Sequence, residues 1–214
     1  MRTLAIAPLS QAHFNHKGMH MRSLRSLATI GSTTLLLSAC LVPEQFNAKV
    51  EFQSDGSYTF RYVGSAVHAM AAAQIKKGGT LSAKDEDALK SEVLKMEKRP
   101  EVKKATYKGA GRYELDIQDA KKPGQPLKMF NIFSVITDPK SGVTELSSPK
   151  LTEKSKADLE QLGMKIDGKL EVSLPKNAEV IFSNATSTPT LRFGSYSWKI
   201  GAIGQRAEMK VKFK

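Results

Sequence analysis

Short runs of alternating hydrophobic and polar residues fill most of the chain after residue 47, which is the pattern of strands that bury one face. The first two runs lie on either side of an Asp55-Gly56 pair. Asp-Gly between alternating runs is a strong hairpin signal, because these residues tolerate the positive φ angles of a tight turn. The pattern predicts strands at about 48–54 and 57–63. The apolar positions that would share one face are Val50, Phe52, Tyr58, Phe60 and Tyr62.

Three segments favour helices instead. Residues 65–77 are rich in alanine, the best helix former, and two glycines follow them. Ser82, with Asp85 three residues later, forms a capping box for a second helix, which Pro100 limits. A third helix is expected at about 152–162. The expected core positions are Leu89, Val93 and Met96 in the second helix and Leu159 and Leu162 in the third.

Further strands complete the expected fold. Their approximate ranges are 102–108, 112–118, 127–137, 143–147, 168–174, 179–183, 190–200 and 207–214. The segment 127–137 is the most continuously apolar and is predicted to be a central strand, and the strands after residue 167 are predicted to form a β-meander. Together the elements indicate an α+β fold, with an antiparallel sheet of about eight to ten strands and about three helices in a single domain.

The segment from Met21 to Cys40 departs from this pattern. It begins with two arginines, continues with an uncharged and mostly apolar run at 27–37, and ends on small residues, which is the composition of a secretory signal peptide. The run is shorter than the about 20 residues that a membrane-spanning helix needs. We therefore assign residues 21–39 to a signal peptide and interpret residues 1–20 as an upstream extension or a mis-assigned start.

The end of this segment, Leu37-Ser38-Ala39-Cys40, resembles the lipobox of bacterial lipoproteins. That resemblance implies that Cys40 is lipidated, carries acyl groups such as palmitate, and becomes the first residue of the mature protein. An ordinary secretory signal with a stray cysteine, or an apolar core helix, would be the alternatives. Residues 40–46 would then be a lipidated tether, since Pro43 discourages helix there, and residues 47–214 the globular domain.

The residue after the cysteine bears on the membrane that would hold the protein. In Gram-negative lipoproteins, an aspartate at this position commonly retains the protein at the inner membrane. This chain has Leu41 there. By this resemblance we expect a lipid anchor on the periplasmic face of the outer membrane.

A second resemblance extends over most of the mature chain. It rests on four short segments: Ser54-Asp55-Gly56-Ser57, Val172-Ser173-Leu174-Pro175, Asn184-Ala185 and Ser197-Trp198-Lys199-Ile200. With the lipobox cysteine before them, they resemble the LppM-like envelope lipoproteins. This resemblance implies a lipidated N-terminus, an α+β globular domain and an envelope location, and it implies no catalytic residues.

Composition narrows the choice of partner. Removing residues 1–39 leaves 214 − 39 = 175 residues, enough for one domain with a substantial core. The removed part holds four basic and no acidic residues, so 33 − 4 = 29 basic and 21 acidic side chains give a net charge of +8. A basic envelope protein favours anionic partners such as lipid headgroups or glycans. Nucleic acid is not an expected partner of an exported protein.

The inventory of reactive side chains is small. The mature chain holds one histidine, His68, and its only cysteine is Cys40. A zinc site of Cys and His ligands is therefore excluded within one chain, and a Ser-His-Asp triad could form only around His68. The chain contains neither a P-loop nor a G-x-S-x-G motif. We expect no metal, no cofactor and no catalysis. An envelope hydrolase with a Ser-, Asp- or Glu-based site is the alternative.

A dense group of basic residues is the remaining candidate for a binding site. Its members are Lys95, Lys98, Arg99, Lys103, Lys104, Lys108 and Arg112. Tyr107 and Tyr113 lie among them and would suit a membrane interface, because tyrosine has an apolar body and a polar tip. The alternative interpretation is a solvated face that keeps the protein soluble. The sequence therefore favours a non-enzymatic lipoprotein that binds an anionic lipid, glycolipid or glycan, or a partner protein. An apolar groove rimmed by cations would distinguish it from an enzyme.

Overall fold

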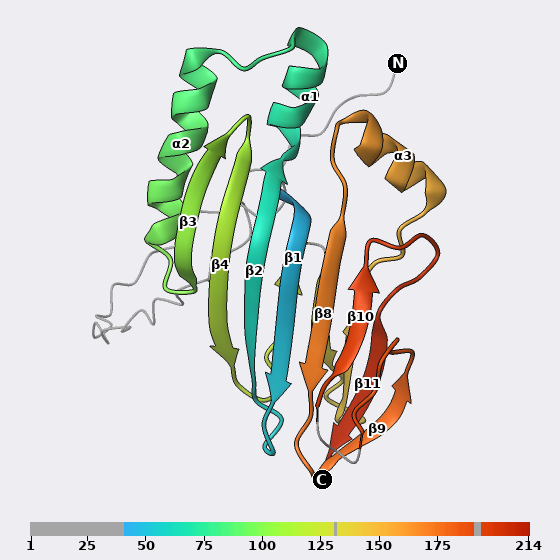
Figure 1. Cartoon of the computed structure of the whole chain (residues 1–214). Coiled ribbons are helices and arrows are strands. Elements are labelled where there is room, and N and C mark those ends of the chain that lie inside the picture. The colour runs from blue at the N-terminus through green and yellow to red at the C-terminus, as the bar shows by residue number, and fades with distance from the viewer. Residues whose placement is uncertain (1–40, 131, 191–193) are drawn as a thin grey trace, which may run out of the picture. The chain divides into compact units, whose positions relative to one another are not determined.

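The computed structural model describes residues 41–130, 132–190 and 194–214 (Figure 1). The elements are β1 (Leu41–Phe52), β2 (Tyr58–His68), α1 (Ala69–Gly78), α2 (Ala83–Glu97), β3 (Val102–Gly109), β4 (Arg112–Lys121), β5 (Leu127–Met129), β6 (Phe133–Thr137), β7 (Val143–Ser147), α3 (Glu153–Gln161), β8 (Asp167–Ser173), β9 (Ala178–Ser183), β10 (Tyr196–Ile200) and β11 (Glu208–Phe213). The α+β class with three helices is confirmed for these residues. None of these helices is long and apolar enough to cross a membrane.

The strands form two sheets rather than one. Sheet A has the order β10-β8-β1-β2-β4-β3, and sheet B has the order β5-β6-β7-β11-β9. The prediction of one antiparallel sheet of eight to ten strands is therefore wrong, since the described residues form eleven strands. The expected β-meander is also wrong, because β8 and β10 join sheet A while β9 and β11 join sheet B. Sheet A is mixed, since β1 pairs in parallel with β8.

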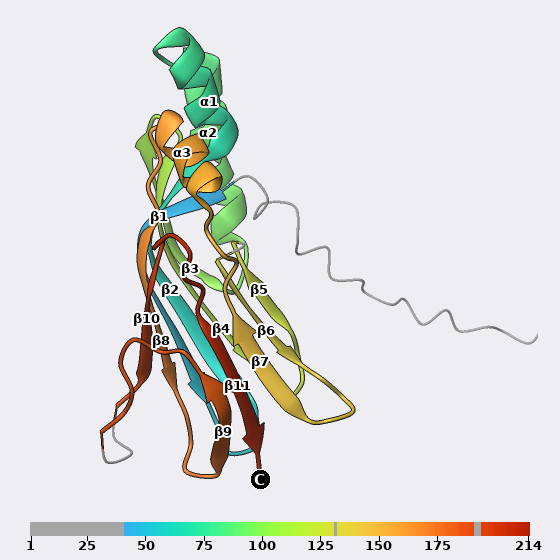
Figure 2. The ribbon, with the colours of Figure 1, turned by 90° about the vertical axis from the view of Figure 1, so that its right-hand side faces the viewer.

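The two sheets enclose one main core, and Figure 2 shows them edge-on. Sheet A contributes fully buried Val50, Tyr62 and Leu170, and sheet B contributes Leu146 and Val211, each 1% exposed. All belong to a single cluster of packed residues. Side chains alternate between core and solvent along each strand, so hydrophobic alternation in the sequence marks the core face correctly but does not tell which sheet a strand joins.

The β1–β2 hairpin forms as the Asp55-Gly56 pair predicts. Gly56 has φ of 81°, and the Ser57 backbone N–H donates to Asp55 Oδ1 at 2.9 Å. Both strands are longer than expected, because Leu41 pairs with His68 at the far end of the ladder. Residues 41–46 therefore belong to sheet A and are not a separate tether.

Two glycines opposite Phe46 allow β1 to lie between β2 and β8. Phe46 pairs with Gly64 of β2 on one side and with Gly168 of β8 on the other. A Cβ atom on Gly168 would lie 2.2 Å from the Phe46 ring, and one on Gly64 would lie 2.2 Å from the Gln45 carbonyl oxygen. Both glycines are needed to let the backbone and this ring approach so closely. Gly64, which directly follows the predicted strand at 57–63, is a mid-strand residue of β2.

The helices form where their signals predict them, and only α1 begins clearly later than expected. His68 caps α1, accepting the Ala71 backbone N–H at 3.3 Å through Nδ1, so residues 65–68 belong to β2 and not to the helix. Ser82 caps α2 as predicted, accepting the Asp85 backbone N–H at 3.1 Å. The predicted stripe of α2 faces the core, with Leu89 and Met96 buried and Val93 packed against them.

Tyr107 and Tyr113 join α2 to sheet A. The Tyr107 hydroxyl donates to Glu86, and the Tyr113 hydroxyl bonds the Leu89 carbonyl at 3.0 Å. Burial, followed by the hydrogen bond to Glu86, raises the pKa of Tyr107 to about 12. Both rings thus serve the contact between helix and sheet, whereas the sequence had suggested a membrane interface for them.

The segment 127–137 is not one central strand. It folds back on itself as β5 and β6, which pair antiparallel with Met129 opposite Phe133. Phe130 has a φ of 42°, a left-handed conformation that ends β5. No glycine or proline marks this turn, which is why the sequence indicated a continuous strand.

Candidate functional site

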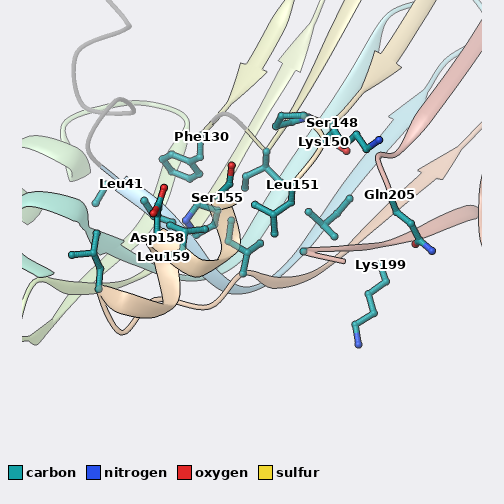
Figure 3. A pocket seen from close by; sticks show the side chains of 18 residues that line it. Leu41, Phe130, Ser148, Lys150, Leu151, Ser155, Asp158, Leu159, Lys199 and Gln205 are labelled. Carbon is teal, nitrogen blue, oxygen red and sulfur yellow. The ribbon is translucent and has the colours of Figure 1, made fainter. Parts of the chain in front are cut away.

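A cleft of about 650 Å³ lies between the start of β1, helix α3 and the ends of β6, β7 and β10 (Figure 3). We call it the α3 cleft. Twelve of its 18 lining residues are apolar: Leu41, Val42, Pro43, Phe130, Ile132, Pro149, Leu151, Leu159, Leu162, Ile166, Ile200 and Gly201. The other six are Ser148, Lys150, Ser155, Asp158, Lys199 and Gln205. Its volume is within the range of about 300–1,000 Å³ that is usual for small-molecule pockets.

Helix α3 forms one wall of the cleft. Thr152 caps it, accepting the Ser155 backbone N–H at 3.1 Å. Leu159 and Leu162, predicted as the inner side of this helix, line the cleft and pack against Val67 and Met164. None of the residues of α3 is fully buried. The helix therefore covers an apolar space without filling it.

The end of α3 is tied to sheet A. Arg112 forms a paired ion contact with Glu44 of β1, with Nε 3.0 Å from Oε2. Its Nη2 also donates to the Gly163 carbonyl at 3.3 Å. Met164, 2% exposed, follows directly and packs beneath the helix. These contacts hold the wall of the cleft against the first strand.

Gly201 shapes the opposite side of the cleft. It has φ of 107°, and a Cβ atom there would lie 2.1 Å from the Ile166 carbonyl oxygen. Only glycine permits this approach of the end of β10 to the chain that leads into β8. The apolar side chains of Ile166 and Ile200 thereby face the cleft from neighbouring strands.

The polar groups of the cleft are few, and two are already engaged. Ser148 Oγ accepts the Ala207 backbone N–H at 2.8 Å, and Ser155 Oγ lies 2.8 Å from Thr152 Oγ1. Asp158 is the only carboxylate among the described lining residues. Across residues 41–130, 132–190 and 194–214, no group of three or more His, Cys, Asp or Glu could hold a metal ion. Among the described lining residues, the polar groups are therefore few, and the two serine hydroxyls are engaged in hydrogen bonds within the chain.

Two lysines are among the lining residues of the cleft. Lys150 follows β7, and Lys199 lies on β10, where its Nζ is 3.9 Å from Asp167 Oδ1. The Lys199 side chain is 73% exposed, so that ion pair is weak. Figure 3 shows the Lys199 side chain extending away from the other labelled lining side chains, as expected for an exposed position between buried Trp198 and Ile200.

Three members of the predicted basic group have partners within the chain. Lys108 pairs with Glu114 at 3.1 Å, Arg112 pairs with Glu44, and Lys103 donates to the Pro100 carbonyl at 2.7 Å. Lys95 is in the last turn of α2, Lys98 and Arg99 follow that helix, and Lys104 is on β3.

The sheet register separates the basic residues further. Arg112 is level with Val42, because both flank Val67. Lys104 is level with Asp116, four residues farther along β4 than Arg112 and so about 14 Å away at about 3.4 Å per residue. The binding role of the group stays a prediction. Cys40 lies outside the described residues, directly before Leu41 of the cleft.

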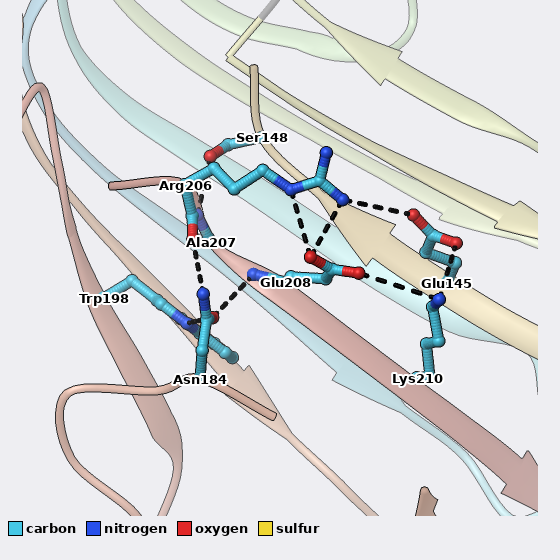
Figure 4. A network of polar contacts seen from close by, with 8 residues as sticks. All are labelled: Glu145, Ser148, Asn184, Trp198, Arg206, Ala207, Glu208 and Lys210. Carbon is cyan, nitrogen blue, oxygen red and sulfur yellow. Dashed lines mark hydrogen bonds and ion pairs between the residues drawn. The ribbon is translucent and has the colours of Figure 1, made fainter. Parts of the chain in front are cut away.

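A second polar network joins the two sheets beside β10 (Figure 4). Asn184 Oδ1 accepts both the Trp198 indole N–H of sheet A and the Glu208 backbone N–H of sheet B, each at 2.8 Å. Its Nδ2 donates to the Arg206 carbonyl at 2.7 Å. Two of the segments behind the LppM-like resemblance, Asn184-Ala185 and Ser197-Trp198-Lys199-Ile200, therefore meet here in a structural contact.

The cleft itself was not found from the sequence. Its lining comes from several segments far apart in the chain, and only the inner side of the 152–162 helix was indicated by hydrophobic spacing. The tetrapeptide before Leu41 gave a chemical signal, but nothing in the sequence connected that signal to a cavity.

Comparisons with known proteins give a limited result. No protein-family model matches the chain, and no curated protein matches it. Among solved structures, the chain is similar to the NMR structure of the folded domain of the Mycobacterium tuberculosis LppM protein, with a TM-score of 0.36 and 13% sequence identity. The similarity covers 78% of this chain and 87% of that one. This similarity is too distant to assign the chain to a family.

Proposed function

We propose that this chain is a lipid-anchored lipoprotein of the bacterial envelope, and that its α3 cleft binds the acyl part of an anionic envelope lipid. The observation that carries the proposal is the apolar cleft of about 650 Å³, with Lys150 and Lys199 among its lining residues. An apolar cavity with a few charged groups at its mouth is complementary to an amphiphile with an anionic head.

The anchor in this proposal is Cys40. The basic and apolar segment before it and the Leu37–Cys40 tetrapeptide support processing and lipidation there. Two or three acyl chains give stable attachment, whereas a single chain is marginal. Leu41, in place of an aspartate, favours the periplasmic face of the outer membrane.

The magnitudes indicate which part of the ligand is selected. Burying one methylene stabilises by about 0.8 kcal/mol, so about twelve methylenes moved from water into the cleft contribute on the order of 10 kcal/mol. A lipid in a bilayer already has this stabilisation, so the apolar contacts nearly cancel for a lipid taken from the membrane. The head group then decides selectivity. Two exposed cations near an anionic surface contribute about 2 kcal/mol together, or about 30-fold.

The same geometry argues for binding and against hydrolysis. A hydrolase needs a nucleophile within hydrogen-bond reach of a base. Among the described lining residues, Ser148 accepts a backbone N–H and Ser155 lies beside Thr152, and neither hydroxyl is hydrogen-bonded to Asp158. His68 caps α1 and is not a lining residue.

The basic group keeps a secondary role in the proposal. Lys108 and Arg112 lie at the end of sheet A where β1 begins, and would contact anionic headgroups beside the anchor. Lys95, Lys98, Arg99, Lys103 and Lys104 lie toward or beyond the start of β3 and would contribute less. Replacing Lys103, Lys104 and Lys108 with Ser tests this through salt-dependent binding of the unanchored domain to anionic vesicles.

The test of the proposal is the lipid that the protein carries. Full-length protein is purified from bacterial membranes in mild detergent, and native mass spectrometry measures non-covalent lipid. We expect one anionic lipid per chain, lost in Leu159→Glu and in the cleft-filling variant Leu151→Trp. Leu94, 64% exposed on α2, supplies the control Leu94→Glu, which should retain the lipid. A wild-type protein without lipid, or variants that retain it, would contradict the proposal.

The head-group preference has its own control. Lys150→Glu and Lys199→Glu should shift the bound lipid from anionic toward zwitterionic species, whereas Lys212→Glu on β11, exposed and outside the lining of the cleft, should not. An unchanged lipid class in all three variants would show that the charges of Lys150 and Lys199 do not select the ligand.

A further inference from the structure

The start of β1 brings the anchor to the cleft. Leu41, Val42 and Pro43 all line the α3 cleft, and Leu41 is 6% exposed. Leu41 is also held in the sheet, because it pairs with His68 of β2. The chain therefore has no free residues between the position of the expected lipid anchor and the wall of the cleft.

Covalent geometry sets how far apart the two can be. Consecutive Cα atoms are about 3.8 Å apart, so Cys40 begins one residue from Leu41 wherever its side chain points. A flexible tether of six residues would have let the domain stand up to about 20 Å from the membrane. The observed strand removes that slack. If Cys40 is acylated, the cleft is held at the membrane surface.

From this we infer that the α3 cleft opens onto the leaflet that holds Cys40 and takes its lipid directly from that leaflet. The inference rests on the proposed function and on lipidation of Cys40, and it adds the source of the ligand. The partner is a bilayer lipid with an anionic head, and not a lipid delivered through water by a carrier. The physical reason is the cost of exposing acyl methylenes to water, which a transfer at the membrane surface avoids.

The surroundings of the cleft suit this orientation. Helices α1 and α3 and the first residues of β1 lie at the same end of sheet A (Figure 1). This end carries exposed Met70 on α1, 67% exposed, and the cations Lys76 and Lys77 in the last turn of that helix. An apolar side chain beside lysines is suited to an anionic interface. The domain would rest on this end, with the rest of sheet A extending away from the membrane.

Inserting a spacer after Cys40 tests this inference independently of the proposed function. A twelve-residue Gly/Ser segment is inserted between Cys40 and Leu41, which keeps the anchor and the cleft but restores slack of about 20 Å. The control carries the same insertion after Pro123, in the loop between β4 and β5. Each full chain is expressed, processed and reconstituted into vesicles that contain an anionic phospholipid with a photo-reactive acyl chain. Brief illumination at successive times and peptide mass spectrometry then measure labelling of α3.

We expect α3 to be labelled at least tenfold faster in the wild type and the loop-insertion control than in the spacer variant. Detergent-solubilised lipid should label all three proteins equally, which establishes that the spacer leaves the cleft intact. Equal rates in vesicles would overturn the inference and leave the proposed function standing. Absence of labelling in the cleft from either source would overturn both.

Discussion

Replacing Asn184 with Ala should remove the side-chain hydrogen bonds that join the two sheets at this residue and should lower the stability of the domain. Asn184 makes three hydrogen bonds: it accepts from Trp198 of sheet A and from the Glu208 backbone of sheet B, and it donates to the Arg206 carbonyl. Alanine offers neither acceptor nor donor. Asn184 is exposed, so the change removes no apolar side chain from the core.

The expected loss of stability follows from what remains unpaired. Trp198 is 4% exposed, so its indole N–H would be left without a partner, at a cost of about 1–3 kcal/mol. The two backbone groups lie nearer to solvent, and losing their bonds costs about 0.5–1.5 kcal/mol each. We expect a total of about 3 kcal/mol, which lowers the melting temperature by about 6–12 °C in a domain of this size.

Urea unfolding of the unanchored domain measures the free energy, and a double-mutant cycle with Trp198→Phe isolates the side-chain bond. In the Trp198→Phe background, Asn184→Ala should cost at least about 1 kcal/mol less, since there is no indole N–H to strand. Asn184→Asp keeps the acceptor and should cost less than alanine. An equal cost of Asn184→Ala in both backgrounds would refute the role assigned to the Trp198 bond.

Three further outcomes are expected. Cys40→Ser should leave an unprocessed or unanchored form, as measured by membrane fractionation and intact-mass analysis. A mutant with the same membrane association and mass of attached lipid as the wild type would contradict lipidation of Cys40. Gly168→Ala places a Cβ 2.2 Å from the Phe46 ring and should lower the free energy of unfolding, measured in urea, by about 1–3 kcal/mol. The control is Gly124→Ala, which has open space around it but a φ of 73° and so reports the cost of backbone strain alone. The hydrogen bond and charge of Arg61 lower the pKa of Asp116 below its usual 3.8. This carboxylate therefore stabilises the fold above about pH 4, and the contribution is lost as pH falls through the folded-state pKa. Asp116→Asn should flatten that part of the curve of stability against pH, and an unchanged slope would contradict the assignment.

Local signals in the sequence predicted local structure. The Asp55-Gly56 turn and the Ser82 cap occur where expected, because a turn or cap depends on residues within a few positions of it. The prediction for the 127–137 segment was wrong because its turn is not set by residues within a few positions of it. The turn depends on the left-handed conformation of Phe130. The ring centroid of Phe130 lies 5.2 Å from that of Tyr62, which is on β2, far away in the chain.

Choices between distant partners could not be made from the pattern. The alternation in β8 and in β9 is compatible with either sheet, and only packing assigns β8 to sheet A and β9 to sheet B. The first residues of β1 were read as a tether because Pro43 breaks helices, although a proline is tolerated where a strand is irregular, as at the register shift between Pro43 and Phe46. The cleft was missed as a result, since three of its lining residues are in that stretch.

The parallel pairing of β1 with β8 has a consequence for how the chain acquires its structure. Gln45 pairs with Asp167, a separation of 167 − 45 = 122 residues, and the ladder between these strands is in the middle of sheet A. Closing so long a loop is slow compared with forming the β1–β2 hairpin. A chain exported with its N-terminus first would therefore present β1 as an open edge until residues 167–173 emerge. During that interval β1 would be open to pairing with another chain.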